Sequence, residues 1–141
     1  MANYCCTIRS NYFHVKDDEA FRALMDRVYG CEDSVELWEE RDKDGRTVFG
    51  FGAYGGISGL RDLDGDNDDS YDDFIDRLQE SVADDDAIII LESGNEKMRY
   101  VVGSATIITS TECRNMDITD LATKQASEML NNPSWKTQCE Y

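Results

Sequence analysis

The sequence predicts an α+β domain in which a mainly antiparallel sheet of about five strands carries three packed helices. Apolar residues recur at helical spacing in three segments, and they alternate or form short runs in the segments between. The segments follow the order β-α-β-β-α-β-β-α, and turn sequences join consecutive strands, so the strands are expected to pair as antiparallel hairpins. A length of 141 residues suits a single domain spanning residues 1–141.

The first half of the chain is predicted to form a strand, a helix and a hairpin. Residues 4–10 alternate in side-chain character as a strand does. Asp17 is placed to cap a helix that Gly30 ends. Residues 35–54 then form a hairpin around a turn at 42–45, because an Asp-Gly sequence favours a tight turn.

The second half is predicted to contain two helices and a second hairpin. Ser70, with Asp73 three positions later, resembles a capping box in which Asp replaces the usual Glu. The helix that follows places Phe74, Ile75 and Leu78 on its buried face. The remaining elements are predicted as strands at 87–92 and 97–109 with a turn at 93–96, a helix at 118–130 that Pro133 stops, and a short tail at 133–141.

Acidic residues are concentrated in two segments. Residues 62–86 hold twelve acids and one base, and residues 17–44 hold eleven acids and four bases. The other positions hold seven acids and nine bases, so the two segments account for the net charge of −16. Solubility of a small domain needs a net charge of only about 2–8 in magnitude. We therefore expect no direct binding to nucleic acid or to an anionic membrane, and attraction to strongly basic partners.

A rigid domain with this density of carboxylates can occupy a channel that grips nucleic acid. Duplex DNA carries one negative charge per about 1.7 Å of its axis, and proteins that bind it line their channels with Lys and Arg. The simpler interpretation is that the acids only solvate a helix face, and the sequence leaves both open. The candidate partner-binding residues are Asp62, Asp64, Asp66, Asp68, Asp69, Asp72, Asp73 and Asp76, together with Tyr54 and Tyr71.

The two tyrosines are selected from a group of aromatic residues that flank the acidic segments. Aromatic side chains rimmed by charge often anchor interfaces, but core packing explains most of this group equally well. Tyr54 and Tyr71 bracket the glycine-rich and acidic loop, so they are the predicted apolar anchors. The whole group is Trp38, Phe49, Phe51, Tyr54 and Tyr71.

The acidic loop at about 60–70 partly matches a calcium-binding loop. Asp62 and the aspartates at alternate positions after it follow the 1-3-5 spacing, and Asp73 stands at the twelfth position. Asn67 occupies the sixth position, where an EF-hand requires Gly. We predict no metal site and no cofactor, with weak cation binding by the loop as an alternative.

Catalysis is poorly supported by the sequence. His14 is the single histidine, and its apolar surroundings favour a packed or surface residue over a general base. Residues 50–55 approximate Gly-x-Gly-x-x-Gly, but they fall in a hairpin arm instead of closing a strand and opening a helix. We predict that the protein is not an enzyme and has no catalytic residues.

Cysteine usage and the lack of long apolar runs point to the cytosol. The five cysteines are an odd number without paired spacing, so neither a disulfide framework nor a zinc site is expected. The first ten residues lack the basic start and apolar core of a signal peptide. No apolar run approaches the roughly 20 residues of a membrane helix. We expect a cytoplasmic protein that does not contact membranes.

Two segments carry a resemblance to a known family. Residues 11–17 (Asn-Tyr-Phe-His-Val-Lys-Asp), with Phe21 following, resemble the opening of a family of small acidic proteins carried by phages, plasmids and integrated elements. Residues 96–103 (Glu-Lys-Met-Arg-Tyr-Val-Val-Gly) are similar to the second hairpin of the same family. The resembling motifs are structural, and the family supplies no functional residues. Its setting implies anti-defence roles, such as those of anti-CRISPR or antirestriction proteins.

Charge and resemblance together predict a non-enzymatic anti-defence inhibitor acting in the cytoplasm of a host bacterium. Its partner would be a basic nucleic-acid-binding protein, with a CRISPR effector nuclease as the first choice, because Lys and Arg line the guide and target channels of such enzymes. The alternative is a regulatory, small-ligand or calcium-binding module of a mobile element. The sequence also allows a homodimer through an edge strand or an apolar face.

Overall fold

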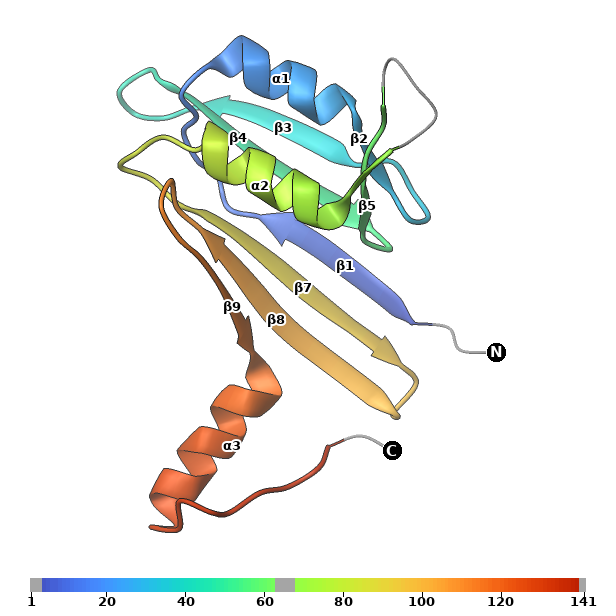
Figure 1. The fold of residues 1–141 in the computed structure, drawn as a ribbon, viewed down its shortest axis with the longest axis vertical. Coiled ribbons are helices and arrows are strands. Elements are labelled where there is room, and N and C mark those ends of the chain that lie inside the picture. Colours follow the sequence, from blue (N-terminus) through green and yellow to red (C-terminus); the bar gives the residue numbers. More distant parts are fainter. Residues whose placement is uncertain (1–3, 63–67, 140–141) are drawn as a thin grey trace.

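A computed structural model describes residues 4–62 and 68–139 as an α+β fold, as predicted (Figure 1). Within these ranges the chain forms three helices and nine strands. The elements are β1 (Cys5–Ser10), α1 (Asp18–Asp26), β2 (Val28–Gly30), β3 (Glu36–Arg41), β4 (Thr47–Tyr54), β5 (Ile57–Leu60), β6 (Asp69–Ser70), α2 (Tyr71–Ser81), β7 (Ile88–Glu96), β8 (Tyr100–Ile108), β9 (Cys113–Asp117) and α3 (Ile118–Met129).

Antiparallel pairing builds a large sheet in the order β3-β4-β1-β7-β8-β9 and a small sheet in the order β2-β5-β6. The first strand of the chain is central, because β1 pairs with β4 on one side and with β7 on the other. The edges of the large sheet are β3 and β9. Helices α1 and α2 lie side by side over one face of this sheet (Figure 1).

Phenylalanine side chains fill the space between these two helices and the sheet. Phe49 and Phe51 point from β4 toward the helices, as the alternation of that strand predicts, and both are fully buried. Phe21 of α1 and Phe74 of α2 meet them at ring-centroid distances of 4.9 Å and 5.8 Å. Phe13 completes the cluster, edge-on to Phe21 at 5.5 Å. Such pairs add stability beyond the area that they bury.

The predicted caps of the helices are confirmed. The side chain of Asp17 accepts a hydrogen bond from the backbone N–H of Ala20 at 3.1 Å. Ser70 and Asp73 form the complete capping box: Ser70 Oγ accepts from the N–H of Asp73, and the Asp73 carboxylate accepts from the N–H of Ser70. An Asp at this position therefore makes the same backbone hydrogen bond that a Glu makes in most capping boxes.

Two predicted boundaries are wrong. Helix α1 ends at Asp26 and does not reach Gly30, because the next residues leave the helix to pair with β5. The turn predicted at 93–96 is part of β7, which pairs with β1 and β8 along this stretch. Gly94 permits that pairing, since a Cβ at Gly94 would lie 2.6 Å from the carbonyl oxygen of Cys5. The chain turns instead just after β7, where Lys97 has a φ of +51°.

Helix α3 differs from the other two in its position. It begins at the end of β9, and Asp117 caps it by accepting from the N–H groups of Thr119 and Asp120. Its first residue, Ile118, lies against Gly103 of β8. Gly103 is on the face of the sheet opposite to buried Ile108, so α3 starts on the face that α1 and α2 do not cover. Across residues 4–62 and 68–139, no helix is long and apolar enough to cross a membrane.

Candidate partner-binding surface

The fold brings the two acidic segments of the sequence into one layer. Helix α1 carries part of the first segment and α2 carries part of the second, and the two helices are neighbours (Figure 1). Residues of both helices line a common crevice, among them Ala20 from α1 and Arg77 from α2. We call the exposed side chains of α1 and α2 the acidic helix layer. Its exposed carboxylates are Glu19, Asp26, Asp72, Asp73, Asp76 and Glu80.

Several of the predicted acids have structural partners. Asp68 accepts a hydrogen bond from the backbone N–H of Asp62 at 3.0 Å, and this bond joins the two ends of the acidic loop. Asp69 pairs with Arg27 at 3.3 Å, which ties the start of α2 to the end of α1. Asp73 belongs to the capping box described above. The predicted residues Asp64 and Asp66 lie outside the described residues.

Asp72 and Asp76 remain as exposed carboxylates on α2, and Glu80 extends the row by one turn. Glu80 lies 3.7 Å from Arg77, an exposed pair of the kind that contributes little to stability. Because this row holds neither the cap nor the link to α1, its charge can be changed at the cost of only this weak ion pair. It is therefore the best test surface in the acidic helix layer.

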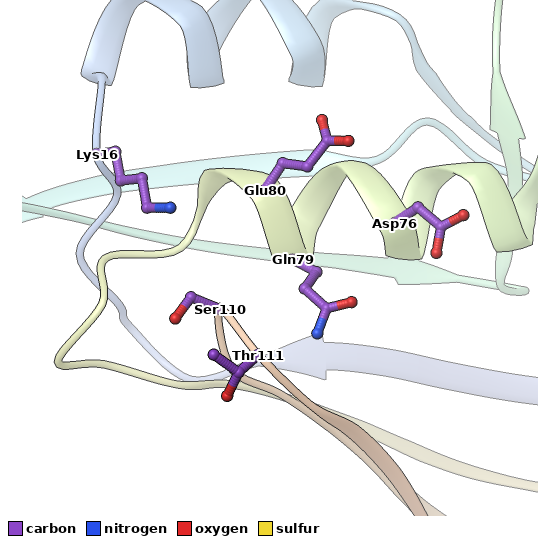
Figure 2. Close-up of a pocket in the computed structure, with 6 residues that line it drawn as sticks. All are labelled: Lys16, Asp76, Gln79, Glu80, Ser110 and Thr111. Atoms are coloured by element: carbon purple, nitrogen blue, oxygen red, sulfur yellow. The ribbon is translucent and has the colours of Figure 1, made fainter.

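A polar cleft of about 690 Å³ runs beside this row, between α2 and the turn that follows β8. Figure 2 shows Gln79 extending from α2 toward Thr111, with Asp76 one turn away and Lys16 at the far end. Lys16 pairs with Asp84 at 3.5 Å. A cleft with carboxylates and hydroxyls on its walls can accept the head of a Lys or Arg side chain from a partner. The lining residues are Lys16, Asp76, Gln79, Glu80, Ser110 and Thr111.

The two tyrosines selected as anchors lie on different faces of the sheet. Tyr71 begins α2 and packs half-buried against Phe74 at 6.2 Å, and this burial raises the pKa of its hydroxyl to about 12. Tyr54 is 65% exposed and alternates with Phe51, so it projects from the face that α2 does not cover. The structure thus separates Tyr54 from the acidic helix layer, and Tyr71 is the tyrosine that adjoins it.

The other flanking aromatics are packing residues. Phe49 and Phe51 are in the core. Trp38 lies across the glycines of β4: a Cβ at Gly52 would be 2.7 Å from its ring, and Arg9 lies over the ring at 4.9 Å. The glycines at 50 and 52 therefore make room for an indole, which explains them without a nucleotide site.

His14 is held between two carboxylates. Its Nε2 lies 2.7 Å from Asp42 and its Nδ1 lies 2.8 Å from Asp86, whose carboxylate also accepts from the backbone N–H of His14. Hydrogen bonds to Asp42 and then to Asp86 raise the pKa of His14. The hydrogen bond to His14 lowers the pKa of Asp42. At Asp86, burial alone would raise the pKa, but hydrogen bonds from His14 and from the backbone N–H of Ala87 together lower it. The His14 ring thus joins the β3–β4 turn to the segment before β7, as a structural residue.

This arrangement predicts a pH-dependent contribution to stability. A raised histidine pKa stabilises the fold fully below the unfolded value of 6.5, and the contribution is lost as pH rises through the folded value. The aspartates contribute above their unfolded value of 3.8 and lose this contribution as pH falls. We expect His14→Gln to lower the melting temperature by about 3–6 °C at pH 5.5 and by less at pH 9. Identical pH profiles of melting temperature for both proteins would contradict this role.

Within residues 4–62 and 68–139, no group of three or more His, Cys, Asp or Glu side chains is arranged to hold a metal ion. One ligand of the partial calcium pattern, Asp73, serves the capping box of α2. The thiols of Cys31, Cys113 and Cys139 are exposed, and burial raises the pKa of Cys6. No protein-family model, curated protein or solved structure matches the chain.

Proposed function

We propose that this chain is a non-enzymatic anti-defence inhibitor that binds the basic nucleic-acid channel of a host nuclease in the bacterial cytoplasm. The observation that carries the proposal is that parts of both acidic segments lie on the neighbouring helices α1 and α2, in one layer. A channel lined with Lys and Arg attracts such a layer for the reason that it attracts a phosphate backbone, including the release of counterions. A CRISPR effector is the preferred partner, since its positively charged channel recognises the guide–target heteroduplex by backbone charge and shape and not by base sequence.

The contact would centre on α2. Asp72, Asp76 and Glu80 supply exposed carboxylates along roughly two turns of helix. The cleft beside them can receive one basic side chain. Half-buried Tyr71 supplies apolar surface at the start of the same helix. Tyr54 has no part in this contact, because it faces the other side of the sheet.

A small-ligand module is the second candidate, and a pocket of about 400 Å³ favours it. The pocket lies at the end of the large sheet beside the glycine-rich turn, and its volume is within the range of ligand sites. In this pocket the hydroxyl of Tyr4 donates a hydrogen bond to the carboxylate of Glu92 at 2.8 Å. Burial is the main cause that raises the pKa of Tyr4, and the bond to Glu92 raises it further. A thermal-shift screen with nucleotides and calcium tests this candidate, since binding a folded-state ligand raises the melting temperature.

The test of the proposed function is a pull-down with tagged protein from lysates that contain candidate defence effectors. The column is washed at low and then at moderate salt, because a complex between an acidic layer and a basic channel weakens steeply as salt rises. We expect a basic nuclease to bind at low salt and to elute at moderate salt. Retention of no basic protein would overturn the proposal and leave the ligand module.

A further inference from the structure

Residues 109–139, the C-terminal part of the chain that the structure describes, bury no side chain. Ile108 is the last buried residue, and each position from 109 to 139 is exposed or half-buried. This stretch still forms regular structure, with strand β9 and the twelve-residue helix α3. A helix of this length is only marginally stable in water without tertiary packing, so its apolar residues need a surface to cover them.

Helix α3 has an apolar stripe that faces solvent. Ile118, Leu121 and Met129 recur at helical spacing and are 59%, 44% and 82% exposed. In α1 and α2 the equivalent residues are buried in the core. The difference follows from position, because α3 leaves the end of β9 and contacts the sheet through its first turn (Figure 1).

The sheet beside α3 is apolar as well. Leu91 of β7, Val101 of β8 and Met116 of β9 are 51%, 69% and 40% exposed, and alternation places them all on the face away from α1 and α2. A shallow groove of about 330 Å³ separates this face from the start of α3. A second groove of about 390 Å³ lies between α3 and the tail that holds Trp135. We call this combined surface of β7, β8, β9, α3 and the tail the C-terminal face.

Charge indicates what can cover the C-terminal face. Residues 87–139 hold six acids and five bases, a net charge of −1, although the whole chain has −16. A strongly basic partner would be drawn to the acidic helix layer and not to this face. The acidic helix layer would repel a second copy of the chain, but the near-neutral C-terminal face adds little electrostatic repulsion when two such faces approach each other. The near-neutral face thus suits a second copy.

Size supports the same occupant. A stable protein–protein interface engages roughly 20–30 residues on each side. The C-terminal face offers at most 25 residues, which is within that range: two of β9 (Arg114 and Met116), the twelve of α3, the nine of the tail from 131 to 139, and Leu91 and Val101. Among residues 4–62 and 68–139, no strand pairs with the outer edge of β9, and this edge belongs to the same surface.

We propose that two copies form a symmetric homodimer in which the apolar stripe of each α3 packs on the C-terminal face of the other copy. A twofold arrangement uses the same surface on both copies, so each α3 both covers its partner and is covered by it. The acidic helix layers stay on the outside of the dimer, on the face of each sheet away from the contact. The dimer does not depend on the proposed inhibitory function.

Sedimentation equilibrium of the full chain tests this proposal. The expected mass is twice the 16.0 kDa of one chain at about 100 µM. Leu121→Glu and Met129→Glu each bring two charges into the contact, one from each copy. We therefore expect the dissociation constant of the dimer to be at least about 100-fold higher for either variant. Both side chains are exposed in the isolated monomer, so circular dichroism at low protein concentration should show that the variants keep the wild-type fold.

Ala23→Glu is the matched control, because it also introduces Glu at an exposed apolar residue, but on α1, on the face of the sheet away from the C-terminal face. It should leave the dimer intact. A wild-type chain of single mass at about 100 µM would overturn the proposal. So would dimers of unchanged affinity in both α3 variants, or a dimer that only Ala23→Glu dissociates.

Discussion

Replacing Asp72, Asp76 and Glu80 of α2 together with lysine is expected to weaken binding to the basic partner by on the order of 100-fold or more, and to abolish inhibition. The substitutions turn three exposed negative charges into positive ones opposite a channel of Lys and Arg. Asp73 is left in place, because its carboxylate completes the cap of α2. The measurement is the dissociation constant of the captured nuclease at low salt, together with residual cleavage activity.

A matched control separates the position of the charge from its amount. Glu36 and Glu40 of β3 and Asp44 of the following turn are also exposed, and they lie outside the acidic helix layer. Their triple replacement by lysine changes the net charge equally and should reduce affinity only slightly. Equal losses in both triple variants would assign the effect to net charge, and no loss in the α2 variant would refute the proposed contact.

Phe51→Ala is expected to lower the free energy of unfolding by about 3–5 kcal/mol, the range for an aromatic residue truncated in a core. The Phe51 ring is fully buried, and its centroid lies 6.1 Å from that of Phe13 and 5.8 Å from that of Phe74. Its removal leaves a cavity between β4 and α2. Since domains of this size are stable by roughly 5–15 kcal/mol, the variant should be close to unfolding at physiological temperature.

Urea denaturation followed by circular dichroism measures this loss. Tyr54→Ala on the same strand is the control, because its side chain is 65% exposed and its truncation should change stability by no more than about 0.5 kcal/mol. A loss below about 1 kcal/mol for Phe51→Ala would show that the phenylalanine cluster is not the main core.

The sequence was sufficient where local rules decide structure. Asp17 and Ser70 begin helices because each side chain accepts a hydrogen bond from a nearby backbone N–H. Alternation places Phe51 and Tyr54 on opposite faces of β4, but only the structure shows that Phe51 is buried and Tyr54 exposed. The short strands β2, β5, β6 and β9 were missed, since they span two to five residues and show no clear alternation. Gly94 was interpreted as a turn residue because the sequence does not show that the backbone of β1, distant in the chain, leaves no room for a side chain at position 94.

The candidate surface was predictable in charge but not in detail. Counting acids identifies the segments, but only the fold shows that α1 and α2 share a layer. The pairing of Asp69 with Arg27 joins residues 42 positions apart, so sequence spacing could not reveal which carboxylates are structural. Similarly, the periodicity of α3 predicts a buried stripe, yet its place at the sheet edge leaves that stripe exposed.

The most direct test of the central claim is a competition between this protein and target DNA for a guide-loaded CRISPR effector. Labelled duplex is bound to the effector, and its fluorescence anisotropy is followed as the protein is added at low and at moderate salt. We predict displacement of the DNA near one equivalent at low salt, weaker displacement at moderate salt, and none with the α2 lysine variant. DNA that stays bound at saturating protein would contradict occupation of the channel by the acidic helix layer.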